Sequence, residues 1–168
     1  MYKDWNAVEF FQQLTAQNKL CQEKGFRFVK ISGLQGLEEA ISQMQETKNF
    51  VAVIDNAVGY TELQNTPHTT RVRTLFFAMR HKLGDMSARE RCMDTIRDIH
   101  QQFCSKLLME RTRLEQDRLY IDSRITLQEA SQYLVPGTAI CMCEISVTKY
   151  IDLSFNPDQW LLTSRPNS

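Results

Sequence analysis

Cysteine and histidine are the residue types in this sequence that most readily support nucleophilic, redox or metal chemistry. The chain contains Cys21, Cys92, Cys104, Cys141 and Cys143, together with His68, His81 and His100. Cys141 and Cys143 form a C-x-C pair, but a zinc site would need a second pair of ligands at a suitable spacing, and the sequence has none. Free cysteine packs like a small apolar residue, so both thiols are expected in the core, on one face of a strand.

The histidines lack the neighbours that would give them a catalytic role. His100 falls in the apolar stripe of a predicted helix, which favours a partly buried structural side chain. His68 follows Pro67 in a predicted loop, with no nucleophile and orienting carboxylate nearby. The sequence therefore identifies no catalytic, cofactor-binding or metal-binding residue, and we expect a protein that is not an enzyme and needs no cofactor. A metal site assembled from three distant segments is left open.

Two further patterns have structural interpretations. Asp94 and Asp98 lie four residues apart on a predicted helix, but the neighbouring Arg91 and Arg97 favour an ion-paired, solvated helix face. The glycines of residues 32–37 lack the lysine and the spacing of a phosphate-binding loop. That segment is predicted to be a turn between a strand and a helix.

Charge is distributed most unevenly between residues 68 and 91. This stretch has only two acidic residues against Arg71, Arg73, Arg80, Lys82, Arg89 and Arg91. It is either a solvated strand end or a patch for an acidic partner or for nucleic acid. Residues 155–162 combine large apolar groups with a position near the terminus, so they either contact a neighbour or fold back. The predicted interface residues are Arg71, Arg73, Arg80 and Trp160.

The composition is that of one ordinary globular domain over residues 1–168. The chain is 42% hydrophobic and 24% charged, with 20 basic and 20 acidic residues. A net charge of zero provides no overall field toward nucleic acid or lipid. The odd number of cysteines favours reduced thiols and cytoplasmic synthesis, and no run of about 18 apolar residues predicts a membrane span.

Hydrophobic periodicity predicts the elements that would position these residues. The first half is predicted to begin with a helix from an Asp4 N-cap to near Asn18, a strand at 26–32 and a helix at 34–47. A strand at 50–55, a long connection or hairpin tip at 56–70 and a long strand at 70–83 are predicted to follow. The long strand has apolar residues on both faces at its centre, so we expect it in the middle of the sheet.

The second half is predicted to contain the longest helix. Ser87 and Glu90 have the spacing of a capping box, with Met86 placed as a hydrophobic staple, and the apolar stripe ends between Leu114 and Arg118. Strands follow at 119–122 and 138–153, and residues 155–168 form a terminal arm. This order predicts an α+β fold: a mainly antiparallel sheet with helices packed on one face, and one long helix in the second half.

This order resembles a family of small proteins of Bacteroides-type prophages and, more loosely, the tail-terminator and tail-completion proteins of long-tailed phages. The resemblance rests on the long basic and aromatic strand, the Gly84-Asp85 helix start and the ending TKYIDLSFNPDQW. It implies a ring-forming homo-oligomer without a cofactor that joins tail tube and head connector proteins. We also expect incidental contact with DNA in a lumen, no membrane contact, and a location in the virion after cytoplasmic synthesis.

Two other classes of function are compatible with the sequence. A small ligand-binding or nucleic-acid-binding regulatory module would show a continuous basic face and salt-sensitive binding. A small enzyme would show a pocket in which polar groups converge around a histidine.

Overall fold

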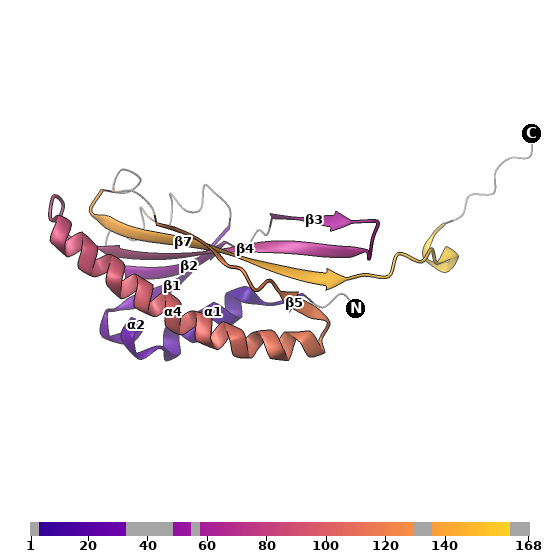
Figure 1. Cartoon of the computed structure of the whole chain (residues 1–168), viewed down its shortest axis with the longest axis horizontal. Helices are drawn as coiled ribbons and strands as arrows, with labels where there is room; N and C mark the ends of the chain where they lie inside the picture. The colour runs from indigo at the N-terminus through magenta and orange to yellow at the C-terminus, as the bar shows by residue number, and fades with distance from the viewer. Residues whose placement is uncertain (1–3, 33–48, 55–57, 130–135, 162–168) are drawn as a thin grey trace, which may run out of the picture.

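A computed structural model describes residues 4–32, 49–54, 58–129 and 136–161 of the chain. The helix predicted at 34–47 lies outside the described residues. The described part is an α+β structure with one mixed sheet and helices on one of its faces (Figure 1), as the sequence predicted.

The sheet has seven strands in the described part of the chain, in the order β1-β2-β4-β7-β5, with β3 beside β4 and β6 beside β7. Only β1 and β2 pair in parallel among these strands, so the sheet is mainly antiparallel. The strands are β1 Phe26–Ile31, β2 Asn49–Ile54, β3 Val58–Glu62, β4 His68–Arg80, β5 Leu119–Ile121, β6 Thr126–Glu129 and β7 Thr138–Tyr150.

The paired strands β4 and β7 run the whole length of the sheet. Their register is continuous over 13 residues, from His68 opposite Tyr150 to Arg80 opposite Thr138. Strand β2 pairs with the second half of β4, and β6 pairs with the first half of β7. Strand β3 pairs with the first half of β4, and β5 pairs with the second half of β7. We call the part of the sheet formed by β3, β5, residues 68–74 and residues 144–150 the distal half. The predicted central position of the long strand is confirmed.

Helices α1 (Ala7–Gln17), α2 (Lys19–Glu23) and α4 (Met86–Gln116) lie on one face of the sheet (Figure 1). Phe103 of α4 joins the helices to the sheet: its ring stacks on that of Phe11 at 6.2 Å and meets that of Phe77 edge-on at 5.4 Å. Each fully buried side chain of this size stabilises the fold by about 2 to 3 kcal/mol. The apolar stripe predicted for the long helix is therefore the seam between helix and sheet.

The opposite face of the sheet has a second, smaller apolar cluster. Its buried members come from β1, β2 and β4: Ile31, Phe50, Ala52, Phe76 and Ala78. Alternation along a strand sends successive side chains to opposite faces, so Leu75 and Phe77 join the helix side while Phe76 and Ala78 join this cluster. The prediction that the centre of β4 is covered on both faces is confirmed.

Both helix starts differ from the prediction. Helix α1 is capped by Asn6, whose Oδ1 accepts from the backbone N–H of Glu9 at 3.1 Å. Helix α4 is capped by Asp85, whose Oδ1 accepts from the N–H of Ala88 at 2.8 Å. The predicted Asp4 cap and Ser87 capping box are therefore wrong. In each case a second residue with an acceptor side chain, two positions away, occupies the cap because its backbone leaves the helix there.

Helix α2 and strands β3 and β6 were not predicted. The short helix α2 begins at Asn18, which also ends α1 and accepts from the N–H of Cys21 at 2.8 Å. Strand β3 lies within the predicted connection, and β6 lies within a stretch that has no strand periodicity. Both strands are exposed along their whole length, so neither shows the apolar alternation on which prediction depends.

Candidate functional site

Two of the predicted interface residues, Arg71 and Arg73, bind the start of the chain instead of projecting freely. Oδ2 of Asp4 accepts from Nη1 of Arg71 and from Nη2 of Arg73, both at 2.9 Å. The side chain of Arg73 is only 13% exposed, whereas that of Arg71 is 43% exposed. These arginines therefore anchor the segment before α1 to the helix side of the sheet, and Arg71 keeps a solvent-facing part.

The other two predicted interface residues lie elsewhere. Arg80 is exposed at the opposite end of β4, and strand alternation directs it to the other face from Arg71 and Arg73. Trp160 follows a single 3-10 turn in the C-terminal segment, where it is 62% exposed and stacks on Phe155 at 6.2 Å. The structure does not bring the four residues into one surface, and their interface role stays a prediction.

The cysteines are packing groups in the described structure. Cys141 and Cys143 lie in the main core on one face of β7, as predicted. Burial raises the pKa of the Cys141 thiol to about 11 and that of the Cys21 thiol to about 12. Thiols with raised pKa values stay protonated at neutral pH, and the protonated thiol is a poor nucleophile and metal ligand.

A cysteine–histidine contact that sequence reasoning missed lies in the middle of α4. Sγ of Cys104 is 3.5 Å from Nε2 of His100, one helical turn away. Burial raises the pKa of Cys104 and lowers the pKa of His100. Both groups are held neutral, which is the reverse of the thiolate–imidazolium pair that activates a cysteine. The four-residue spacing was the available signal.

Asp94 of α4 is ion-paired to Arg97 on an exposed helix face, as the sequence predicted for this residue. Arg97 donates to Asp94 at 2.7 Å, to Glu90 at 2.9 Å and to Glu129 of β6 at 2.8 Å. These bonds tie the exposed strand β6 to the helix. Within the described residues, no group of three histidine, cysteine, aspartate or glutamate side chains is placed to hold a metal ion.

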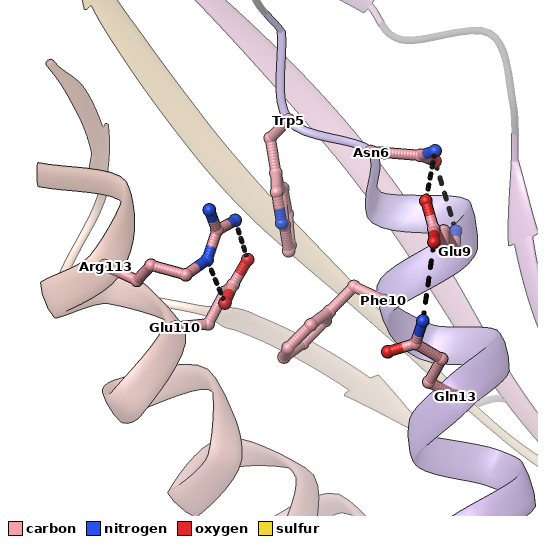
Figure 2. A pocket seen from close by; sticks show the side chains of 7 residues that line it. All are labelled: Trp5, Asn6, Glu9, Phe10, Gln13, Glu110 and Arg113. Atoms are coloured by element: carbon pink, nitrogen blue, oxygen red, sulfur yellow. Dashed lines mark hydrogen bonds and ion pairs between the residues drawn. The ribbon is translucent and has the colours of Figure 1, made fainter. Parts of the chain in front are cut away.

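A cavity of about 270 Å³ lies between the start of α1 and the last turns of α4. Its lining, drawn in Figure 2, consists of Trp5, Asn6, Glu9, Phe10, Gln13, Glu110 and Arg113. The polar groups bind one another: Glu9 accepts from Asn6 at 3.0 Å, and Glu110 accepts from Nε of Arg113 at 2.9 Å. Nε1 of Trp5 is buried without a partner in the described structure. Carboxylates held by their own neighbours are not presented to a substrate, so we do not take this cavity as the site.

The clearest functional candidate is a row of four rings across the distal half of the sheet. Tyr60 of β3 lies 5.9 Å from His68 of β4, His68 lies 6.0 Å from Tyr150 of β7, and Tyr150 lies 5.4 Å from Tyr120 of β5, measured between ring centroids. Register and alternation place all four on the face opposite the helices. We call these four residues the aromatic row.

The aromatic row is open to solvent. Tyr60 is 59% exposed, Tyr150 is 49% exposed and Tyr120 is 38% exposed. Nδ1 of His68 donates to the carbonyl oxygen of Thr66 at 2.8 Å, which fixes the ring beside the hairpin tip. His68 thus begins a strand rather than lying in a loop, which corrects the prediction for this residue.

Other exposed apolar side chains lie at the distal half and in the C-terminal segment. At the distal half and in the C-terminal segment that continues from it, the large apolar side chains that face solvent are Val58, Leu63, Leu153, Phe155, Trp160 and Leu161. Contiguous exposed apolar surface is uncommon on monomeric proteins and marks binding surfaces. Figure 1 shows the C-terminal segment leaving the sheet at the distal end of β7 and running away from the body.

The charges of this face restrict what it can bind. The registers place Glu62 and Glu144 on this face, beside Thr70, Thr148 and Ser146. Within the distal half, no described lysine or arginine of β3, β4, β5 or β7 lies on it. Backbone phosphates of nucleic acid are bound mainly by lysine and arginine. The face is therefore suited to apolar and aromatic contacts with a protein partner rather than to a polyanion.

Sequence reasoning could not have found the aromatic row. Its members come from four strands, and only Tyr60 and His68 are close in the sequence. Tyr60, His68 and Tyr150 each lie within two residues of a threonine, but Tyr120 does not, so no local signal is shared by all four.

Helices long and apolar enough to cross a bilayer do not occur in the described ranges of the chain. Comparison of the whole sequence with protein-family models and with curated proteins found no match to either.

Proposed function

We propose that this protein is a non-enzymatic assembly subunit that associates with copies of itself through the distal half of its sheet. The more specific form of the proposal is a ring at the tail of a phage particle, where the subunit acts as a tail-terminator or head–tail joining protein. Its partners in that role are tail tube or head connector proteins.

The observation that carries the proposal is the unequal distribution of exposed apolar groups. The core half of the sheet buries both of its faces in the described structure, whereas the distal half presents the aromatic row to solvent. Tyrosine and tryptophan are enriched at the centres of protein interfaces because they combine a large contact area with few rotatable bonds. Burial of this surface against a neighbour would stabilise the assembly.

The proposed ring form follows from the separation of two surfaces on one chain. The aromatic row and the C-terminal segment are different patches, so contact of one with the other joins copies head to tail. Head-to-tail contacts close into a ring when the rotation per subunit divides a full turn. The helices, on the opposite face, remain available for a different partner.

The pKa shifts support the non-enzymatic part of the proposal. Burial is the largest cause that shifts the pKa values of the core thiols and of the His100 imidazole toward the neutral forms. Catalytic groups are usually shifted by a specific charged partner in a cleft, toward the form that the reaction requires.

The test is the mass of the protein in solution. Size-exclusion chromatography with light scattering is expected to show an oligomer, and negative-stain electron microscopy is expected to show rings. Tyr150→Lys is expected to shift the mass toward the monomer, because a lysine in the middle of the row places a charge in the contact.

Leu108→Lys is the matched control, since Leu108 is 65% exposed on the outer face of α4. It should leave the mass unchanged. A wild-type protein that is monomeric at every concentration, or a Tyr150→Lys variant with the wild-type mass, would contradict the proposal. Salt-sensitive binding of single-stranded DNA that Tyr150→Lys abolishes would instead support a stacking platform for bases.

A further inference from the structure

The first residues of the C-terminal segment have the sequence pattern of a strand but no strand partner. Ile151, Leu153 and Phe155 alternate with Asp152, Ser154 and Asn156, which is the period-two pattern of a strand with one buried face. In the described structure these residues lie outside the sheet, and Leu153 and Phe155 are 49% and 67% exposed. A backbone bond from the N–H of Ile151 to the carbonyl oxygen of Pro67, at 3.0 Å, ties the start of this segment to the end of the sheet.

Strand β3 has an edge without a strand partner in the described structure. It pairs with β4 along one edge, and no described strand pairs with its other edge. All five of its residues are exposed, and the strand has neither a lysine nor a proline. Proline and charged side chains, lysine above all, keep an edge strand from pairing with another chain, and the one charged residue of β3 is Glu62 at its end. Gly59 lies so close to β4 that an added Cβ would collide with the carbonyl oxygen of Thr70.

We propose that residues 151–156 of one copy add as a strand to the open edge of β3 in a neighbouring copy. This inference rests on the proposed self-assembly and names the segment that performs it. Strand addition supplies main-chain hydrogen bonds for affinity and alternate side chains for specificity. The local bond from the N–H of Ser154 to Oδ1 of Asp152, at 2.8 Å, is exchanged for a bond to β3.

The side chains of the two strands match in this arrangement. Val58 and Tyr60 of β3 lie on the face of the aromatic row, so the added Leu153 and Phe155 extend the same apolar face. The polar side chains of the added strand then lie on the face of Gly59. Asp152 then lies on the same face of the sheet as Arg71, the residue that pairs with Gly59 in the register of β3 and β4.

The rest of the segment strengthens this match. Between residues 151 and 161 the only charged residues are Asp152 and Asp158. A short turn, capped by Oδ1 of Asn156 at 3.0 Å from the N–H of Asp158, brings Trp160 onto Phe155. The two stacked rings form a preformed apolar end that covers the row of the neighbour. Because this end is already ordered, less conformational entropy is lost on binding.

A mixing experiment with two full-length variants tests the inference. The donor variant, Leu153→Asp/Phe155→Asp, has a disabled C-terminal segment but an intact β3 edge. The acceptor variant, Val58→Lys/Tyr60→Lys, has a disabled β3 edge but an intact C-terminal segment. Each variant alone is expected to be monomeric. Mixed in equal amounts, they should form a one-to-one pair, because one functional segment and one functional edge remain. Native mass spectrometry with one variant isotope-labelled identifies that pair.

The substituted positions are all solvent-exposed, and circular dichroism confirms that each variant remains folded. Leu108→Asp/Met109→Asp, at equally exposed positions on α4, is the matched control and should keep the wild-type mass. If the donor variant keeps the wild-type oligomer, or if the mixture forms no pair, strand addition is wrong while self-assembly stands. A monomeric wild-type protein overturns both proposals.

Discussion

The carboxylate of Asp4 joins the first described residue of the chain to the middle of the sheet through Arg73. Oδ2 of Asp4 lies 2.9 Å from Nη2 of Arg73, and the two side chains are 28% and 13% exposed. Arg71, two residues earlier on the same face of β4, donates to the same oxygen. Two residues of the basic cluster that suggested a binding patch in the sequence therefore hold the segment before α1.

Breaking this contact should reduce the stability of the protein. In a double-mutant cycle with Asp4→Ala and Arg73→Met, we expect a coupling free energy of about 1 kcal/mol, because the pair is charged and partly shielded from water. Urea unfolding followed by circular dichroism measures it. If Arg73→Met changed the oligomer mass and left the unfolding midpoint unchanged, Arg73 would be an interface residue, as the sequence alone suggested.

The cap of α4 allows a direct comparison of two neighbouring residues. Asp85→Ala should lower the free energy of unfolding by about 1 kcal/mol, because the N–H of Ala88 loses its acceptor. Ser87→Ala should change it by less than about 0.5 kcal/mol, since Ser87 lies inside the helix. Thermal or urea unfolding of both variants measures the two losses. A larger loss of unfolding free energy in Ser87→Ala than in Asp85→Ala would show that Ser87 caps the helix.

Acid should destabilise the protein through His100. Burial lowers the pKa of His100 in the folded state, so the unfolded chain binds a proton at higher pH than the folded chain does. The stability that this difference contributes is present above the unfolded pKa of about 6.5 and is lost as the pH falls below it. We expect His100→Gln to flatten the fall in the unfolding midpoint between about pH 7 and pH 5.

His68→Gln, on the solvent-facing row, is the matched control for that experiment. An equal flattening by both substitutions would show that burial of His100 is not the cause.

The cysteines should react slowly with an alkylating reagent in the native state. Burial raises the pKa of each thiol, so the reactive thiolate is scarce at neutral pH. Cys104, which is partly exposed, should be modified before the other four. Mass spectrometry of peptides after timed iodoacetamide treatment gives the order. Rapid modification of Cys104 at neutral pH would reveal an activated thiol beside His100 and would support the enzyme alternative.

Local sequence patterns were sufficient for the elements that pack against the core. The stripe of α4 and the doubly covered centre of β4 were predicted because burial imposes a regular period on apolar residues. The placement of Cys141 and Cys143 on one buried face followed from the same alternation. Exposed elements impose no such period, and β3 and β6 were missed for that reason.

The caps were mispredicted because several residues with acceptor side chains stand near each helix start. Asp4 and Asn6 both have the chemistry of a cap, and so do Asp85 and Ser87. The selection depends on where the backbone turns out of the helix. The backbone leaves the helix at Asn6 and at Asp85, and Asp4 binds Arg71 and Arg73 instead of capping α1.

Local periodicity and the burial of apolar side chains were enough to predict the α+β class, the long helix and the buried placement of Cys141 and Cys143. Which residues meet at the surface depends on how distant strands pair. The row from Tyr60 to Tyr120 exists only because antiparallel register aligns four strands from distant parts of the chain. Register is a long-range property of paired backbones, and the sequence of any one strand does not contain it.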